Sequence, residues 1–180
     1  MANTSTPMGF RLFMSAGTRN PKRVQRKVHV DPGTNLMVGD AYKLNADGES
    51  VERAVLNSDT ILGIVEGITF NPLPSVSSGL VAQDYIKDGD GGWIIGIEDE
   101  QALFEVEALT AADTVIGDFF ELVDAAGSTT LRQSRQYVQA DQGSNKQFVC
   151  DQVIDRTGNV SGSYRKIAVR LTTSLQSKEA

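Results

Sequence analysis

The stretch DGDGGWIIGIEDEQALFEVE, residues 88–107, carries the pattern from which the fold class can be predicted. Its glycine-rich start is typical of a tight turn, and the apolar run Trp93–Ile97 that follows has the length and composition of a strand. After a short acidic break comes the strand candidate Ala102–Glu107, in which Glu105 and Glu107 alternate with Phe104 and Val106. Because side chains alternate between the two faces of a strand, Glu105 and Glu107 should share one exposed polar face. Short strands divided by compact turns are typical of an all-β protein.

The same pattern extends to both sides of this stretch. Turn clusters such as Asn45-Ala46-Asp47-Gly48 and Thr157-Gly158-Asn159 separate the apolar segments. Helix is scarce, with one candidate turn at Leu109–Asp113 and Thr110 as its N-cap. We therefore expect an all-β fold, a small β-barrel or barrel-like sandwich with an extended N-terminal arm and little helix. The predicted strands are Ala41–Leu44, Arg53–Leu56, Thr60–Phe70, Gly79–Ile86, Trp93–Ile97, Ala102–Glu107, Phe119–Val123, Thr129–Val138, Gln147–Ile154 and Tyr164–Thr172.

Three segments follow from this reading of the chain. Residues 1–30 are predicted to be a basic, partly extended arm, residues 31–173 a β domain, and residues 174–180 a flexible tail. Val24–Val30 shows partial alternation of apolar and polar residues. It is therefore also compatible with an edge strand of the domain, whose basic side chains would discourage unwanted pairing. In that case, truncation would unfold the domain instead of releasing it.

Composition excludes several functional classes. The chain has 180 residues, and its 40% hydrophobic and 22% charged residues are ordinary globular usage. Its one cysteine, Cys150, allows no internal disulfide and is predicted to be a small buried side chain, and its one histidine, His29, supports no scheme that needs two. No apolar run approaches the ~20 residues of a membrane span. The acidic turn Asp88–Gly92 fits a solvated hairpin tip better than a cation site. We expect no catalytic residue, cofactor, metal or membrane partner.

The net charge of -6 hides a strong asymmetry along the chain. Residues 1–30 contain six basic side chains and no acidic one, whereas the other 150 residues contain 11 basic and 23 acidic side chains. An acidic body would be repelled by phosphates, so a protein partner is favoured over nucleic acid. A solvated terminus without a partner is the alternative. The six basic residues are Arg11, Arg19, Lys22, Arg23, Arg26 and Lys27.

One short pattern occurs twice. Residues 38–44, Val-Gly-Asp-Ala-Tyr-Lys-Leu, and residues 116–122, Ile-Gly-Asp-Phe-Phe-Glu-Leu, share a β-branched residue, Gly, Asp, an aromatic residue and Leu at equal spacing. Gly-Asp supports a tight turn, and the aromatic residue and the leucine then face the same side of a strand. We interpret the two copies as equivalent strand beginnings on one barrel, with chance recurrence of a common turn as the alternative.

Several motifs, in their order along the chain, carry a resemblance to a known family. Over most of residues 8–175, the chain resembles the tailed-bacteriophage capsid decoration proteins, also called structural cement proteins. Leu12 stands where that family usually has proline. The similar segments are Met8-Gly9-Phe10-Arg11 (Phe-Gly-Phe-Arg-Pro in the family), Trp93–Ile97 leading into Ala102–Glu107 (a strand ending in Phe-Glu-Val-Gln), Ala111–Gly117 (an Ala-x-Asp-Ile-Gly turn), Gly127–Ser134 and the closing strand Tyr164–Leu171.

The resemblance implies a non-enzymatic protein that binds the outer surface of a bacteriophage head and stabilises the capsid. Its partners would be the major capsid protein and copies of itself, with a trimer favoured by shell geometry and a dimer possible, and with no nucleic acid or membrane partner. It would be assembled in the host cytoplasm and located on the virion exterior. The alternatives are another virion β protein, such as a head fibre or tail-associated protein, and a cytoplasmic small-molecule-binding barrel.

The basic segment supplies the expected interface. We expect Phe10 and Phe13 to be buried against the partner, because aromatic anchors supply most of the affinity at interfaces. The six basic residues would pair with capsid carboxylates or with acidic surfaces of neighbouring copies, mainly to steer encounter. The expected interface residues are Phe10, Arg11, Phe13, Arg19, Lys22, Arg23, Arg26 and Lys27.

Overall fold

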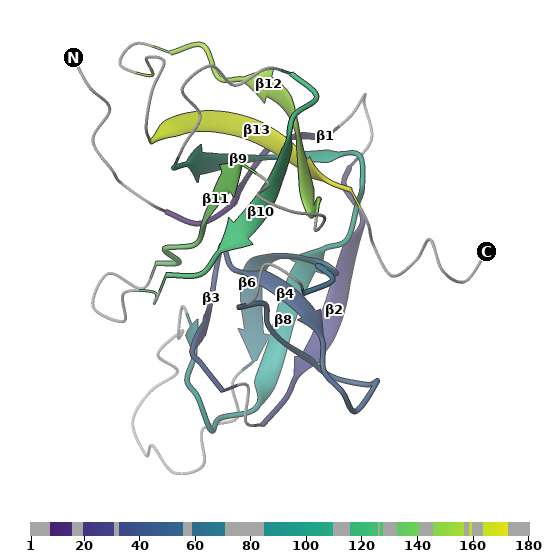
Figure 1. Ribbon diagram of the computed structural model, residues 1–180. Coiled ribbons are helices and arrows are strands. Elements are labelled where there is room, and N and C mark those ends of the chain that lie inside the picture. The colour runs from purple at the N-terminus through teal and green to yellow at the C-terminus, as the bar shows by residue number, and fades with distance from the viewer. Residues whose placement is uncertain are drawn as a thin grey trace.

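The computed structural model describes residues 8–15, 20–30, 33–55, 59–70, 85–109, 116–125, 127, 133–140, 146–156, 159 and 164–172. Within these residues the chain forms strands and no helix, which confirms the predicted all-β class (Figure 1). The strands are β1 (Arg11–Ser15), β2 (Arg23–Val28), β3 (Leu36–Met37), β4 (Ala41–Leu44), β5 (Val51–Arg53), β6 (Gly63–Phe70), β7 (Tyr85–Ile86), β8 (Gly92–Ile97), β9 (Ala102–Ala108), β10 (Phe119–Val123), β11 (Tyr137–Ala140), β12 (Phe148–Val153) and β13 (Arg165–Leu171).

Five strands from the first 97 residues close into a barrel in the order β2-β5-β4-β6-β8. It occupies the lower part of the view in Figure 1. β2 lies antiparallel to β8 along its whole length, from Arg23 opposite Ile97 to Val28 opposite Gly92. The barrel closes where Val28 pairs in parallel with Val51 of β5. Beside it, β3 and β7 form a separate two-stranded sheet. The predicted barrel is therefore confirmed.

The strands of the second half of the chain, together with β1 from its beginning, form another sheet above the barrel, in the order β1-β9-β11-β10-β12-β13 (Figure 1). β9 also pairs with β13, so the strand pairings return to β9. β13 pairs with one edge of β9, and β1 and β11 pair with different parts of its other edge. β1 is the terminal strand in this order. The register between β1 and β9 shifts between Leu12 and Met14. This β-bulge leaves Phe13 without a direct partner on β9.

The barrel and the second sheet share one apolar core. The largest cluster of buried side chains draws on both units, which explains why they pack as one body. From the barrel side come Ala41, Ala54, Ile61, Ile64 and Ile97, and from the second sheet Ala102, Phe104, Val106, Ala108, Phe120, Leu122, Val138, Phe148, Cys150, Ile167, Val169 and Leu171.

Tyr42 occupies the barrel interior and depends on two glycines. Its side chain is fully buried, and its hydroxyl donates a hydrogen bond of 2.9 Å to Glu98 Oε1. A Cβ atom at Gly96 would lie 2.5 Å from Tyr42 Cζ, and one at Gly63 would lie 2.7 Å from the hydroxyl oxygen. Glycine on the two neighbouring strands β6 and β8 therefore makes room for the ring.

The prediction of a separate arm over residues 1–30 is wrong for the parts of that segment that the structure describes. β1 belongs to the second sheet, and β2 is a wall strand of the barrel. β2 is not an edge strand either, because it pairs with β8 on one side and with β5 at Val28 on the other. The β domain thus begins before residue 31. The predicted tail at residues 174–180 lies outside the described residues.

The repeated pattern does mark equivalent strand beginnings, but on two different sheets. Gly39 and Gly117 have φ angles of +89° and +98°, and each precedes an aspartate and then a strand, β4 or β10. Tyr42 and Phe120, the matching aromatic residues, are both buried. The prediction that both copies lie on one barrel is therefore corrected.

Two local predictions also change. The turn at Asp88–Gly92 is not a hairpin tip, because β7 before it pairs with β3 and β8 after it pairs with β2 and β6. Gly89 has the expected positive φ, +85°. The helical turn predicted over Leu109–Asp113 lies, beyond Leu109, outside the described residues.

Candidate partner-binding surface

The two aromatic residues expected to anchor a partner are used within the chain. Phe10 is 2% exposed and stacks on Phe148 of β12, with ring centroids 4.9 Å apart. Phe13 is half-buried and packs against a small cluster of Leu103, Ile154 and Ala168. The prediction that Phe10 contacts a partner is therefore wrong, because its ring is already enclosed.

The residue before Phe10 explains how the ring is positioned. Gly9 has a φ of +67°, and a Cβ atom there would lie 2.6 Å from the carbonyl oxygen of Gly39 and would overlap the Ser134 side chain. Phe10 N–H donates a 2.8 Å hydrogen bond to that same Gly39 carbonyl. The Gly9-Phe10 pair thus docks the chain before β1 into the junction between the two sheets.

Two of the basic residues are neutralised by glutamates of the same chain. Arg23 makes a two-point contact with Glu66, at 2.6 and 2.7 Å, on the exposed side of the barrel. Arg26 makes a two-point contact with Glu98, at 2.7 Å for each bond, and the Glu98 side chain has no exposed surface. Burial, reinforced by Glu98, raises the pKa of Tyr42. Arg26 and Arg23 are therefore parts of the barrel's own ion pairs, and their role at a partner interface stays a prediction.

The remaining basic residues stay at the surface where the structure describes them. Lys22 is exposed, and its backbone N–H donates to an Asp99 carboxylate oxygen at 3.2 Å. Lys27 is exposed on β2, directly opposite Trp93 of β8. Arg19 lies outside the described residues. Among the described members of the predicted set, Lys22, Lys27 and Arg11 thus keep exposed cationic side chains, as does Arg23 within its ion pair.

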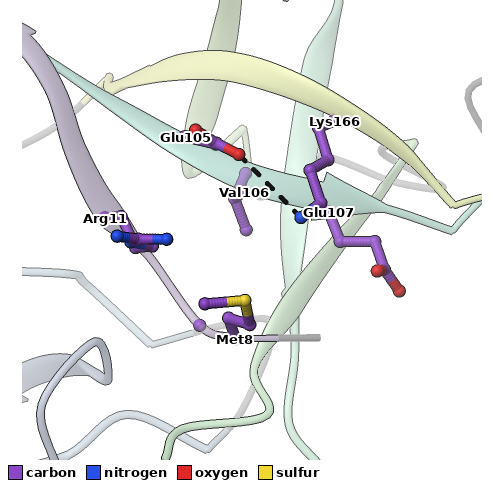
Figure 2. Close-up of a pocket in the computed structure, with 7 residues that line it drawn as sticks. Met8, Arg11, Glu105, Val106, Glu107 and Lys166 are labelled. Atoms are coloured by element: carbon purple, nitrogen blue, oxygen red, sulfur yellow. Dashed lines mark ion pairs between the residues drawn. The ribbon is translucent and has the colours of Figure 1, made fainter. Parts of the chain in front are cut away.

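Arg11 lines a shallow groove between β1, β9 and β13 (Figure 2). Lys166 lies across the groove, 4.0 Å from Glu105, which also pairs with Arg156 at 2.6 Å. The groove has a volume of about 10 Å³, which is room for a single water molecule. Glu105 and Glu107 both line it, as the alternation in sequence predicted, but Glu107 is buried and not exposed. The groove is too small to hold a partner's side chain.

Sequence reasoning missed the exposed apolar side chains. Leu12 and Met14 of β1 are 38% and 51% exposed, at the strand that ends the sheet order. Trp93, Phe119 and Ile116 are also exposed, and the Lys146 ammonium lies 4.9 Å from the Phe119 ring centroid. The sequence carried no signal for these residues of β1, because the bulge between Leu12 and Met14 places them opposite consecutive residues of β9, Phe104 and Leu103, and so breaks the alternation.

A buried polar network joins the two sheets, and no sequence motif indicated it. Arg53 Nη2 contacts Asp124 Oδ1 at 2.6 Å, and Arg53 Nε lies 3.1 Å from Asp40 Oδ2. Gln136 accepts a hydrogen bond from Ala41 N–H and donates one to the Ala54 carbonyl, each 2.7 Å long. Burial raises the pKa of Asp40 to about 6, although the Arg53 charge opposes the shift.

Two residues considered for chemistry lie in unremarkable surroundings. Cys150 is fully buried, as expected, and burial raises the pKa of its thiol to about 11. His29 is half-buried directly after β2, and its backbone N–H donates a hydrogen bond to the Val51 carbonyl. Among the described residues, no three His, Cys, Asp or Glu side chains are grouped so as to hold a metal ion. Those residues also include no helix that is long and apolar enough to cross a membrane.

Comparison with protein families and with curated sequences gives no match. No protein-family model matches the chain, and no curated protein is significantly similar to it in sequence. The assignment of function therefore rests on the residues and contacts described above.

Proposed function

We propose that this protein is a non-enzymatic virion component that binds the outer surface of a bacteriophage head and stabilises the capsid. The major capsid protein is its partner, and neighbouring copies contact one another, in threes where the shell offers threefold positions. It is assembled in the host cytoplasm. Such a protein needs a rigid, soluble body with a complementary surface, and many identical weak contacts around a shell add through multivalency.

The observation that carries this proposal is the position of the Met8-Gly9-Phe10-Arg11 opening. This motif is the first point of similarity to the decoration proteins, and each part of it has a structural reason here. Gly9 has a positive φ and no room for a Cβ atom, and Phe10 is enclosed against Phe148. Arg11 then begins β1 and remains exposed. This structural role of the motif supports a shared fold.

The surface best suited to the capsid is β1. It ends the strand order, and Leu12 and Met14 expose apolar side chains beside the cationic Arg11. Exposed apolar side chains rimmed by polar groups mark protein interaction sites. We therefore assign the apolar contacts with the partner to Leu12 and Met14 instead of Phe10 and Phe13. They lie on the same segment, and their side chains are accessible.

Co-sedimentation tests the proposal. Heads from the encoding phage that lack this protein are mixed with the purified protein, and the bound fraction is measured after centrifugation. We expect saturable binding, and a loss of about tenfold or more in affinity for the double variant Leu12→Glu/Met14→Glu, because buried apolar anchors dominate interface energy. The matched control is Ile116→Glu, which changes a 66% exposed apolar residue elsewhere and should bind normally. Absence of saturable binding by the wild-type protein contradicts the proposal.

A further inference from the structure

A cavity of about 220 Å³ lies at the edge of the junction between the two sheets. Four segments distant in sequence converge on it: the loop before β3, the end of β5, the turn after β7 and the chain after β10. Its lining residues are Thr34, Asn35, Arg53, Asp88 and Gly127. The volume is below the roughly 300–1,000 Å³ of typical small-molecule sites, so the cavity suits a group the size of one polar side chain.

Arg53 gives the cavity a donor that is already held in place. Its side chain is 3% exposed, and its Nη2 atom is engaged by Asp124 and by the Ala125 carbonyl, at 2.6 and 2.9 Å. Its Nε atom faces Asp40 but makes no hydrogen bond. An arginine has five N–H groups, and the hydrogen bonds described for Arg53 use its Nη2 atom. The guanidinium is thus fixed by its neighbours while part of its donor capacity remains unused.

Two further polar groups at the cavity have unused capacity. The Thr34 hydroxyl is buried and has no hydrogen-bond partner in the described structure. Asn35 accepts a 3.0 Å hydrogen bond from Asp88 N–H through Oδ1, which leaves its amide NH₂ as a donor. Buried polar groups are nearly always paired, so an unpaired set around one cavity indicates a missing partner.

The local charge decides the class of that partner. The guanidinium of Arg53 is opposed by the carboxylates of Asp40 and Asp124, and Asp88 adds a further acid at the cavity. An anion would therefore meet an excess of negative charge, whereas a neutral group would not. The complementary ligand has a carbonyl oxygen to accept hydrogen bonds and an N–H group to donate them.

We propose that this cavity binds a primary carboxamide, with Arg53 and Thr34 donating to its carbonyl oxygen and Asp88 accepting from its NH₂ group. The carboxamide belongs either to a free small molecule or to an asparagine or glutamine side chain of a partner protein. The chemistry of recognition is the same for both sources, and it does not depend on the function proposed above.

Titration of the ¹⁵N-labelled full-length protein with propionamide, followed by NMR, tests the site. At pH 7.5 we expect saturable shifts of the Thr34, Asn35 and Gly127 amide signals, and no such shifts with propionate. Thr34→Val keeps the side-chain shape and removes one hydrogen bond, so it should weaken propionamide binding about fivefold. The control Thr69→Val changes an exposed threonine on the outer face of the barrel and should leave the affinity unchanged.

Two results overturn the proposal: no saturable shift with propionamide, or equal affinity in the wild-type protein and Thr34→Val. Arg53 is left intact in this design, because its removal would also disturb the junction. A second arm measures binding of Thr34→Val to phage heads. Weaker head binding assigns the carboxamide to a partner's side chain, and normal head binding assigns it to a free molecule. Failure of head binding by the wild-type protein leaves the NMR result standing, so the two proposals fail separately.

Discussion

Replacement of Gly96 by alanine should destabilise the barrel far more than an ordinary surface substitution. The new Cβ atom would lie 2.5 Å from Cζ and 2.7 Å from Cε1 of Tyr42, and still closer to the hydroxyl oxygen. Tyr42 cannot move aside at low cost, because it is fully buried and its hydroxyl is bonded to Glu98. Relief of the overlap requires the ring to shift and that hydrogen bond to break.

The expected magnitude follows from these two effects. Overpacking of a core costs about 1–3 kcal/mol, and loss of a hydrogen bond to a charged group costs about 1.5–3 kcal/mol. The free energy of unfolding should therefore fall by about 3–5 kcal/mol, which lowers Tm by roughly 10 °C for a chain of this size. Gly67→Ala is the matched control, since a Cβ atom at Gly67, on the neighbouring strand β6 of the same barrel, meets nothing within 4 Å.

Urea unfolding followed by fluorescence of Trp93, the one tryptophan, measures both variants. A double-mutant cycle with Tyr42→Ala isolates the cause, because removal of the ring should reduce the additional cost of Gly96→Ala to under about 1 kcal/mol. If Gly96→Ala and Gly67→Ala differ by less than about 1 kcal/mol, the packing argument is refuted. The same conclusion follows if Gly96→Ala costs as much without the ring as with it.

Four further predictions concern ion pairs, pH, truncation and reactivity. Arg26→Ala should cost about 3 kcal/mol in urea unfolding because it leaves a buried glutamate unpaired, whereas Arg23→Ala, from an exposed pair, should cost about 0–1 kcal/mol; equal costs contradict this ranking. Burial holds the pKa of Asp40 at about 6, above its ordinary 3.8, so the folded state binds this proton more tightly. Its contribution to stability is full below about pH 4 and is lost as pH rises through about 6, by about 3 kcal/mol; urea unfolding of Asp40→Asn between pH 4 and 7.5 should lack this component. Deletion of residues 1–30 removes β1 and β2 and should give an unfolded circular dichroism spectrum, so a spectrum of native strand content would contradict the fold described here. Cys150, with a buried thiol of pKa about 11, should react with a thiol reagent at pH 8 at the rate of unfolding, and rapid labelling of the native protein would be inconsistent with its burial.

Local patterns in the sequence predicted most of the strands well. β4 and β10 have the predicted bounds, because each follows a Gly-Asp turn that defines where the strand begins. β8 and β9 differ by one residue at one end each. β5 was predicted too late, as Arg53–Leu56 instead of Val51–Arg53, and β3, with two residues, is too short to leave a pattern.

The candidate interface was harder to predict because charge and burial depend on contacts between distant residues. Arg23 and Arg26 looked like an exposed basic segment, yet their glutamate partners lie 43 and 72 residues further along the chain. No spacing rule within the segment could reveal those pairs. The cavity at the junction shows the same limit, since its lining comes from four separate segments. The exposed apolar residues of β1 were equally hard to predict, because the bulge between Leu12 and Met14 breaks the alternation of faces along the strand.

Cryo-electron microscopy of heads reconstituted with the purified protein tests the proposed function most directly. The map should show an additional two-part density outside the shell, into which the barrel and the second sheet fit together. β1, with Leu12 and Met14, should face the major capsid protein in that density. A saturated sample whose icosahedral map shows no density outside the shell, or shows it only at the tail vertex, contradicts the proposal.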